Sequence, residues 1–425
     1  MIDINLIREN PELVKENMKK KFRKDLEIVD EVKKLDENWR KLKFDGDKLR
    51  ANRNKISLKI SELKKAGKKA DKELKEAKEI PGKIEKIEEK CAKIEIQIKD
   101  IMMKIPNIMD KSVPIGKDDS ENVEIKKFGE PKVPNFEIPH HADIAENLNC
   151  LDLESSRRTS GHGFYYLKGD LALLHSAMLA FARDFMAKNN FEYHIPPTMI
   201  RSDVVDGVMS FTEKDAMMYK IEGEDLYLIG TSEHSMIGKF INQVLKGSEI
   251  PVLATSYSPC YRKEVGEHGI EEKGLYRVHQ FEKQEMIVIC EPEDSFKWYD
   301  KMLNLTIQVF KEMEIPIRSL NICSGDLADL KVKSADIEAW SPRQKKYFEV
   351  GSCSNLTDAQ ARRLNIRIEN KGKTYFAHTL NNTVLASPRA LIAMIENNYQ
   401  KDGSIKIPKV LQPYILGKQR IERKK

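Results

Sequence analysis

The 425-residue sequence contains no uninterrupted apolar run approaching the length of about eighteen residues that a membrane-spanning helix needs. Its six cysteines lie far apart, with no C-x-x-C pair and no Cys/His cluster at metal-ligand spacing, which indicates reduced thiols rather than disulfides. The first residues, MIDINLIREN, lack the basic lead and apolar core of a secretory signal and contain acids that transit peptides avoid. These absences predict a cytoplasmic protein without a membrane partner.

Two nucleotide-binding motifs are also missing. The sequence has neither a G-x-G-x-x-G turn nor a P-loop lysine motif, which argues against a Rossmann or P-loop nucleotide site. The net charge of +6 is a mild indication of a polyanionic partner. A chain of this length exceeds what one hydrophobic core usually supports, so two or more domains are expected.

The N-terminal region has the spacing of a coiled coil. Apolar residues recur at intervals of three and four from Ile28 to Leu63 and again from Leu74 to Ile105, with Lys and Glu at most other positions. Two such helices, joined at KKAGKKAD, predict an antiparallel hairpin that projects roughly 50 Å. Ile80-Pro81-Gly82 predicts a kink or break in the second helix.

Lysines gather at the tip of this hairpin. Each one alone is most simply a solvated surface residue, but as a group on a projecting arm they suit phosphate contacts with a structured nucleic acid. The five residues are Lys64, Lys65, Lys68, Lys69 and Lys72.

The rest of the chain divides by composition. Residues 1–110 form the predicted arm, residues 111–139, rich in Pro, Asp, Lys and Gly, a linker, and residues 140–425 a globular body. In this body, strand-like runs mostly follow one another without the alternating helices of a parallel sheet. The pattern therefore predicts an α+β fold with an antiparallel sheet.

Residues 258–286, SPCYRKEVGEHGIEEKGLYRVHQFEKQEM, predict two strands joined by a polar loop. Alternation places Arg262 with Glu264 on one face, and Arg277, Phe281 and Glu285 on one face of the return strand. Arginine suits phosphate and carboxylate oxygens, an aromatic ring suits a base, and a carboxylate suits an amine. Alternation alone is explained at least as well by a solvent-facing sheet with cross-strand ion pairs.

The hairpin resembles a known motif. YRKE followed by GLYRVHQFEKQE is similar to motif 2 of class II aminoacyl-tRNA synthetases, in the form typical of seryl-tRNA synthetases. FYYLKG and the segment to HIPP resemble motif 1, LIGTSEH the TSE loop, YFEVGSCSN the ATP and metal strand, and LNNTVLASPRALIAMIENNYQKDGSIKIPKVLQPY motif 3 with its tail. These matches occur in the family's order and, with the arm, cover nearly the whole chain. The resemblance implies a class II synthetase catalytic domain at 140–425 and a tRNA-binding arm at 1–110.

The resemblance also implies an ATP site. Arg262 would hold the α-phosphate and the substrate carboxylate, Arg277 the γ-phosphate and Arg389 both adenine and the γ-phosphate, which makes these three arginines the catalytic residues. Other ATP contacts would come from Lys263, Glu264 at the adenine amino group, Val278, Phe281 under the adenine ring, Glu349, Val350, Gly351 and Ser352.

Glu349 and Ser352 match the family positions that coordinate Mg²⁺ between the phosphates, and oxygen ligands suit that ion. Without the resemblance, Glu349 is equally well explained by pairing with Lys345 or Lys346. Zinc is not expected, because no cysteine occupies a position that matches the pocket.

A serine site is implied next to the ATP site. Asn381 and Thr383 would sense the serine hydroxyl, although Asn-Asn-Thr is also simply a good turn. Ser387-Pro388-Arg389 predicts a helix N-cap, a first-turn proline and the motif 3 arginine, with Pro388 where glycine is usual. The remaining serine contacts would be Thr231, Ser232, Glu233, Arg262 and Glu285.

The implied activity is serine–tRNA ligation: ATP and L-serine give seryl-adenylate, and the seryl group passes to the 3′ end of tRNA(Ser), and of tRNA(Sec) where present. A homodimer built on motif 1 is implied as well. One alternative is a synthetase-like ligase that loads an amino acid onto a carrier protein, but such ligases lack the arm. Another is a coiled-coil nucleic-acid-binding or regulatory protein with an inactive body. No role is assigned to His268, His279 or Lys283.

Overall fold

The computed structural model describes residues 1–210, 214, 216–264 and 274–423, and these divide into two compact units. One unit comprises Ile2–Pro106, and the other comprises Met1 with Asn107–Lys425. Among the described helices, none is both long and apolar enough to cross a bilayer.

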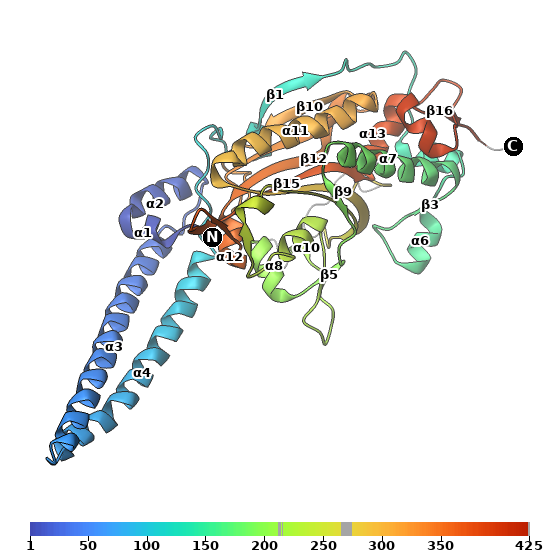
Figure 1. Cartoon of the computed structure of the whole chain (residues 1–425). Coiled ribbons are helices and arrows are strands. Elements are labelled where there is room, and N and C mark those ends of the chain that lie inside the picture. The colour runs from blue at the N-terminus through green and yellow to red at the C-terminus, as the bar shows by residue number, and fades with distance from the viewer. Residues whose placement is uncertain (211–213, 215, 265–273, 424–425) are drawn as a thin grey trace. The chain divides into compact units, whose positions relative to one another are not determined.

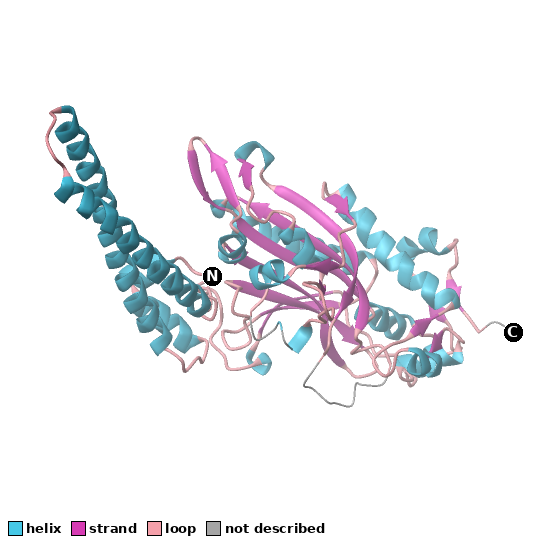
Figure 2. Cartoon of the chain, turned by 90° about the horizontal axis from the view of Figure 1, so that it is seen from below, coloured by secondary structure: helices cyan, strands magenta, loops and turns pink. Residues whose placement is uncertain are grey.

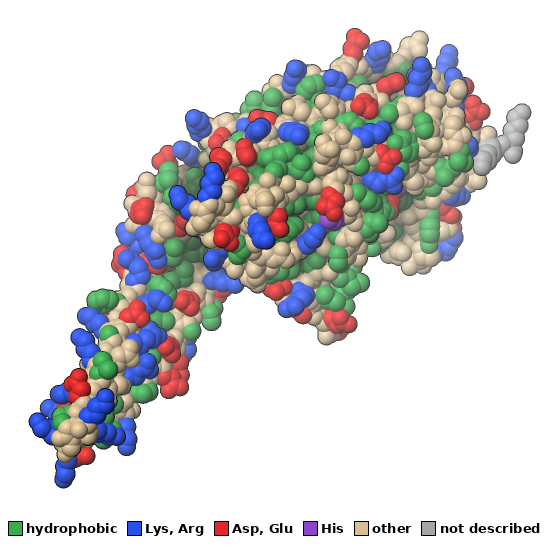
Figure 3. Space-filling model, in the orientation of Figure 1, with side chains coloured by type: hydrophobic (Ala, Val, Ile, Leu, Met, Phe, Trp, Pro, Cys, Tyr) green, Lys and Arg blue, Asp and Glu red, His purple; other side chains and the backbone are tan. Residues whose placement is uncertain are grey.

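The first unit is helical. Two short helices, α1 (Ile4–Glu9) and α2 (Pro11–Lys20), precede the long helices α3 (Glu27–Lys65) and α4 (Asp71–Met102), which run side by side (Figure 1). Ile56, Ile80 and Ile84 are buried in the seam between the long helices, which confirms the predicted antiparallel hairpin. All five tip lysines are exposed, and Lys and Arg side chains crowd this end of the hairpin (Figure 3).

The predicted break at Pro81 is absent, because α4 continues through this residue. Pro81 is exposed, whereas Ile80 and Ile84 on either side of it are buried against α3. Packing of these two isoleucines against α3 therefore offsets the cost of a proline within the helix.

The second unit is built on an eight-stranded sheet with the order β1-β10-β11-β12-β15-β9-β8-β4. All neighbouring pairs are antiparallel except β4 with β8. The strands form one twisted layer (Figure 2), and the predicted α+β fold is confirmed. Their bounds are β1 Val123–Phe128, β4 Glu192–His194, β8 Val252–Tyr261, β9 Gln280–Cys290, β10 Ile317–Asn321, β11 Lys333–Ser341, β12 Lys346–Thr357 and β15 His378–Ser387.

Helices cover both faces of the sheet (Figure 1). One face packs against α7 (Gly169–Lys188), α11 (Ser295–Glu312) and α13 (Arg389–Asn398), which enclose the larger hydrophobic core. The other face packs against α8 (Ser202–Val208), α10 (Ser232–Gly238) and α12 (Ala359–Leu364) over a second core. The middle strands are therefore buried on both sides, mostly by apolar residues, with a few buried polar ones such as Asn382, whose Nδ2 donates to the Met302 carbonyl at 2.7 Å.

Smaller elements complete this unit. Two helices, α5 (His141–Asn147) and α6 (Leu153–Thr159), precede α7. A three-stranded sheet and three two-stranded pairs lie outside the main sheet. Their strands are β2 Leu151–Asp152, β3 Tyr166–Leu167, β5 Met199–Ile200, β6 Tyr227–Leu228, β7 Val244–Lys246, β13 Arg367–Asn370, β14 Lys373–Phe376, β16 Ile405–Lys406 and β17 Arg420–Ile421.

The segment 111–139, expected to be a linker, contributes a strand. Val123–Phe128 pairs with β10 at the edge of the main sheet, from Val123 opposite Asn321 to Phe128 opposite Ile317. Five of the six residues of β1 are exposed, and the strand is charged, so its sequence has no buried face that alternation would reveal.

Two predicted boundaries in the site region are also wrong. The ladder of the motif 2 hairpin ends at Tyr261 opposite Gln280, so Arg262 and Arg277 lie just beyond the strands rather than on them. Ser387 is not a helix N-cap, because it still pairs with Glu282 as the last residue of β15, and Pro388 occupies the N-cap position. The polar loop of the hairpin, including His268, lies outside the described residues.

Candidate active site

A cavity of about 480 Å³ opens at the ends of the central strands. The structure brings nearly all the predicted site residues into its wall; the exceptions are Ser232 and Lys263. The predicted residues in the wall are Thr231, Glu233, Arg262, Glu264, Arg277, Val278, Phe281, Glu285, Glu349, Val350, Gly351, Ser352, Asn381, Thr383 and Arg389.

Two β-bulges explain why consecutive residues of one strand reach the same cavity. The pairing of β11 with β12 slips between Ile337 and Glu338, so that Val350 is an extra residue on β12. A second slip, between Thr383 and Leu385, occurs where β15 pairs with β9. Bulges redirect side chains that would otherwise alternate between the two faces, and residues 349–352 all line the cavity as a result.

Arg262 is held against the ring of Phe281. Its guanidinium carbon lies 5.2 Å from the ring centroid, and its Nε donates a hydrogen bond to the Gly230 carbonyl at 3.1 Å. The Arg262 N–H also donates to the His279 carbonyl at 2.9 Å, which extends the hairpin pairing by one bond. An arginine fixed at one edge in this way keeps its remaining N–H groups for a ligand in the cavity.

His279 supports this arrangement. Its Nδ1 lies 3.1 Å from the Arg262 carbonyl, and its ring packs against Phe164 at a centroid distance of 5.4 Å. A Cβ on Gly163 would come within 2.4 Å of the imidazole, and Gly163 has φ +77°, so both the space and the backbone favour glycine there. His279 therefore has a structural contact and is not directed at the cavity.

Two more arginines enter the wall, each beside a carboxylate. Arg277 Nη1 lies 3.5 Å from Glu264 Oε2, and Arg389 Nη1 lies 2.9 Å from Glu349 Oε2. The Arg389 guanidinium also lies 4.7 Å from the centroid of the Tyr276 ring. Cations in partly enclosed positions, next to carboxylates, are suited to anionic phosphate groups.

A pair of carboxylates forms the inner end of the cavity, where α10 begins. Thr231 is the N-cap of α10, and its Oγ1 accepts a hydrogen bond from the Glu233 N–H at 3.4 Å. Desolvation at the cavity wall and the negative charge of Glu285 raise the pKa of Glu233 to about 7, although a hydrogen bond from Gln360 opposes the rise. Gln360 Nε2 donates to Glu233 Oε1 at 2.7 Å and is itself held by Thr379.

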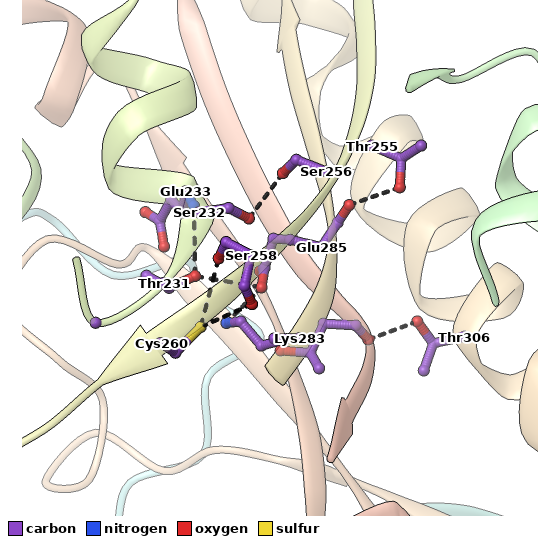
Figure 4. A network of polar contacts seen from close by, with 12 residues as sticks. Thr231, Ser232, Glu233, Thr255, Ser256, Ser258, Cys260, Lys283, Glu285 and Thr306 are labelled. Atoms are coloured by element: carbon purple, nitrogen blue, oxygen red, sulfur yellow. Dashed lines mark hydrogen bonds and ion pairs between the residues drawn. The ribbon is translucent and has the colours of Figure 1, made fainter. Parts of the chain in front are cut away.

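Glu285 has different partners (Figure 4). Its carboxylate forms an ion pair with Lys283 and accepts a hydrogen bond from Thr231 Oγ1 at 3.3 Å. Thr383 lies opposite Glu285 in the pairing of β15 with β9, and Asn381 lies opposite Ser354 in the pairing with β12. The residues predicted to sense an ammonium group and a hydroxyl group therefore meet at the same place.

Oxygen ligands gather on the β11–β12 side of the cavity. Ser352 lies opposite Asp336, and burial together with the charge of Glu349 raises the pKa of Asp336 to about 7. No group of three or more His, Cys, Asp or Glu residues at metal-binding geometry occurs among the described residues. Two carboxylates and a hydroxyl, with further ligands from a polyphosphate, nevertheless fit the preference of Mg²⁺ for few protein ligands.

Ser232 and Lys263 have other contacts. Ser232 is fully buried, and its Oγ accepts a hydrogen bond from Ser256 Oγ at 2.7 Å (Figure 4). Neither serine is in the cavity wall. The Lys263 N–H donates to the Met217 carbonyl at 2.9 Å, and its side chain is not in the cavity wall. Neither residue therefore lines the cavity, and their ligand contacts stay predictions.

Residues 217–398 match the family model of the tRNA synthetase class II core domain (G, H, P, S and T), and residues 1–109 match that of the seryl-tRNA synthetase N-terminal domain. A serine–tRNA ligase from Methanocella arvoryzae is 42% identical over 424 residues, which cover 98% of this chain and 99% of the relative. The chain belongs to the seryl-tRNA synthetase family.

Solved structures of the seryl-tRNA synthetase family agree. Seryl-tRNA synthetase from Pyrococcus horikoshii, complexed with ATP, superposes with a TM-score of 0.95 at 40% identity and full coverage of both chains. The cytoplasmic serine–tRNA ligase from Naegleria fowleri, in complex with AMP, gives a TM-score of 0.90 at 31% identity and covers 100% of this chain and 99% of that one. The family predicted from the motifs is confirmed.

In this member of the seryl-tRNA synthetase family, sequence reasoning missed three polar residues around the cavity: Lys283, Asp336 and Gln360. Lys283 lies between Phe281 and Glu285 at the same period of two, so alternation placed it on the correct face but gave it no partner. Asp336 interacts with Glu349 through their negative charges, and Gln360 donates a hydrogen bond to Glu233. In both pairs the two residues lie on different elements, so no local pattern in the sequence connects them.

Proposed function

We propose that the cavity is the place where this chain, a serine–tRNA ligase, activates L-serine with ATP and then esterifies tRNA(Ser). The observation that carries the proposal is the convergence of three arginines, an aromatic ring and a carboxylate pair on one cavity. Arginines suit the triphosphate, the ring suits adenine, and the carboxylates suit the ammonium group of an amino acid.

Serine would bind at the inner end. Glu233 and Glu285, with Thr231, take its ammonium group, Asn381 and Thr383 take its hydroxyl, and Arg262 orients its carboxylate. A pocket that must satisfy a hydroxyl inside a polar wall disfavours alanine, because alanine would leave the hydrogen-bonding groups of Asn381 and Thr383 without a partner.

ATP would occupy the outer part of the cavity. Phe281 stacks on adenine, Glu264 accepts from its amino group, and the Val278 backbone contacts the nucleotide beside Val350 and Gly351. Arg277 and Arg389 take the β,γ-phosphate oxygens in place of the carboxylates that they contact in the free protein. An arginine that exchanges a carboxylate for a phosphate loses less free energy to desolvation than an arginine that was fully hydrated before ATP bound.

The reaction is an in-line displacement. A carboxylate oxygen of serine forms a bond to the α-phosphorus while the bond from that phosphorus to the bridging oxygen breaks, and pyrophosphate leaves. A hydroxyl of the terminal tRNA ribose then attacks the seryl carbonyl, and AMP leaves. The protein contributes positioning and charge neutralisation, chiefly through Arg262, Arg277 and Arg389.

Mg²⁺ would be held by Glu349 and Ser352 together with the phosphates, with Asp336 close to Ser352. When bound, the ion neutralises phosphate charge and favours departure of pyrophosphate. Burial and the negative charge of Glu349 raise the pKa of Asp336 although the charge of Lys331 opposes the rise, so a further cation at this position would be stabilised by the two carboxylates.

Residues 1–110 are the tRNA-binding arm, with the five tip lysines as phosphate contacts, and residues 140–425 the catalytic domain of a cytoplasmic homodimer. A carrier-protein ligase is disfavoured, because the family model of the seryl-tRNA synthetase N-terminal domain matches residues 1–109.

The decisive experiment is amino-acid-dependent ATP–pyrophosphate exchange with serine, threonine, alanine and glycine. Exchange with serine well above the other three is expected. Folded protein that shows no exchange with serine would refute the proposal. Aminoacylation of tRNA(Ser), compared with transfer to a carrier protein, then separates the two ligase activities.

A further inference from the structure

The cavity wall contains a buried cation, Lys283, to which neither the motifs nor the proposed reaction assigns a role. Lys283 lies on β9 two residues before Glu285, so both side chains point to the same face, where they form an ion pair (Figure 4). The side chains are only 7% and 2% exposed. A pair this enclosed differs from a solvated surface ion pair, because loss of one partner leaves a buried charge.

Glu285 is fixed from several directions besides Lys283. Thr231 Oγ1 donates to its Oε2 at 3.3 Å, and Thr255 Oγ1 donates to its backbone carbonyl at 2.7 Å. Thr383, proposed to sense the serine hydroxyl, lies opposite it on β15. The Lys283 ammonium therefore lies where the proposed ammonium and hydroxyl subsites meet.

The second carboxylate, Glu233, is not ion-paired within the described residues, and the charges of Lys283 and Lys331 act on it without a direct contact. Its side-chain partner is the neutral amide of Gln360. Neighbouring His234 adds no charge, because burial and the nearby cations Arg262 and Lys283 lower its pKa to about 3. Glu285 is thus already paired with a cation, whereas Glu233 has only a neutral hydrogen-bond partner for its carboxylate.

We infer that Lys283 is a specificity-determining residue, the resident counter-ion of Glu285, which lets the pocket accept one ammonium group and reject amino acids that carry a second on a short side chain. This inference rests on the proposed function. A side-chain ammonium at the hydroxyl subsite would meet the like charge of Lys283 in a partly desolvated space, whereas the neutral hydroxyl of serine would not.

A suitable probe is L-2,3-diaminopropionate, which has the serine skeleton with an amine in place of the hydroxyl. This side-chain amine is protonated at neutral pH. ATP–pyrophosphate exchange with the full-length protein gives the ratio of kcat/KM for serine to that for diaminopropionate. We expect Lys283→Met to lower this ratio by about tenfold or more, because the probe's ammonium can then pair with Glu285.

Two variants separate charge from packing. Lys283→Arg keeps the cation, so its ratio should stay near that of the wild type even if both activities fall. Lys331→Met removes another cation of the cavity wall, one that acts on Glu233 and is not paired with Glu285, so it should change the ratio much less than Lys283→Met does. A folded Lys283→Met protein with an unchanged ratio, or an equal fall in Lys283→Arg, would overturn the inference.

A measurement on the wild type does not depend on whether Lys283→Met folds. Diaminopropionate and L-alanine are compared as inhibitors of serine-dependent exchange, because alanine lacks the hydroxyl but adds no charge. Inhibition by diaminopropionate should be weaker than that by alanine by about tenfold or more. Equal or stronger inhibition would overturn the role of Lys283, while absence of exchange with serine would instead refute the proposed function.

Discussion

Arg389 Nη1 lies 2.9 Å from Glu349 Oε2, so the first residue of α13 is joined to the cavity side of β12. The same guanidinium lies over the Tyr276 ring, and its Nε donates to the Tyr276 carbonyl at 3.3 Å. The motif 3 arginine is therefore already directed at the cavity before a nucleotide binds, which reduces the ordering that binding requires.

Arg389→Ala should lower kcat/KM for ATP in serine-dependent exchange by about 10²–10³. This is the usual effect of removing one pre-organised donor to a developing charge. The measurement is steady-state exchange at saturating serine. Arg420→Gln is the matched control, because Arg420 forms a solvated ion pair with Asp402 at 3.2 Å outside the cavity. A loss below about tenfold in Arg389→Ala would contradict its proposed contact with the phosphates.

The affinity for serine should depend on pH through Glu233. Its pKa is raised to about 7, so the carboxylate becomes protonated as the pH falls from 8 to 6 and no longer attracts an ammonium group. The KM for serine should therefore rise over this range by about the factor by which the ionised fraction falls. Glu233→Gln should raise KM at pH 8 and remove this dependence; a dependence that persists in the variant would assign it to another group.

The raised pKa of Glu233 should also make the folded protein less stable at high pH than at low pH. An acid whose pKa is higher in the folded than in the unfolded protein destabilises the fold once it ionises, so stability falls as the pH rises from about 4.5 to about 7. Glu233→Gln should stabilise the protein at pH 8 by on the order of 1–2 kcal/mol and change little at pH 5. Thermal unfolding at the two pH values tests this, and equal Tm changes at both would contradict it.

Stacking on Phe281 should appear in the KM for ATP. Phe281→Leu keeps an apolar side chain but removes the ring, so this KM should rise by about tenfold or more, in the range expected for base stacking. Phe281→Tyr keeps the ring and should stay within about threefold. If both variants behave alike, the residue packs against Arg262 and does not contact adenine.

The tip lysines should matter for tRNA but not for adenylate formation. The combined variant K64Q, K65Q, K68Q, K69Q and K72Q should retain exchange activity and lose aminoacylation through a raised KM for tRNA. The salt dependence of tRNA binding should also become shallower, by nearly one unit of slope for each lost phosphate contact. K371Q with K373Q, two exposed lysines of the other unit, is the control; an equal fall in both reactions would argue against the arm's role.

The sequence predicts the fold best where buried residues recur at the regular spacing of a helix or a strand. The seam isoleucines Ile56, Ile80 and Ile84 recur at heptad spacing, and Phe281 and Glu285 recur at strand spacing, so both groups were placed correctly. β1 escaped prediction because it is charged and exposed at a sheet edge, where neither face is selected for burial.

The candidate site was less predictable where irregular backbone and long-range partners decide the geometry. The bulge at Val350 breaks alternation on β12, and nothing in the local residues marks it. The contact of Gln360 with Glu233 joins positions 127 apart in the sequence. Alternation assigns Lys283 to the correct face, but its role depends on burial beside Glu285, which follows only from the packing of the fold.

The edge strand β1 determines where the helical hairpin could be detached from the enzyme. A shortened chain that started at residue 140 would lack β1, one of the two neighbours of β10, and would leave a row of unpaired backbone N–H and C=O groups that favours association between molecules. A chain that starts at Asn107 keeps that row covered and also keeps the Asn107 amide bonded to the Leu330 and Leu356 carbonyls at 3.1 Å and 3.0 Å. The join between the two modules therefore lies in the short stretch around Pro106.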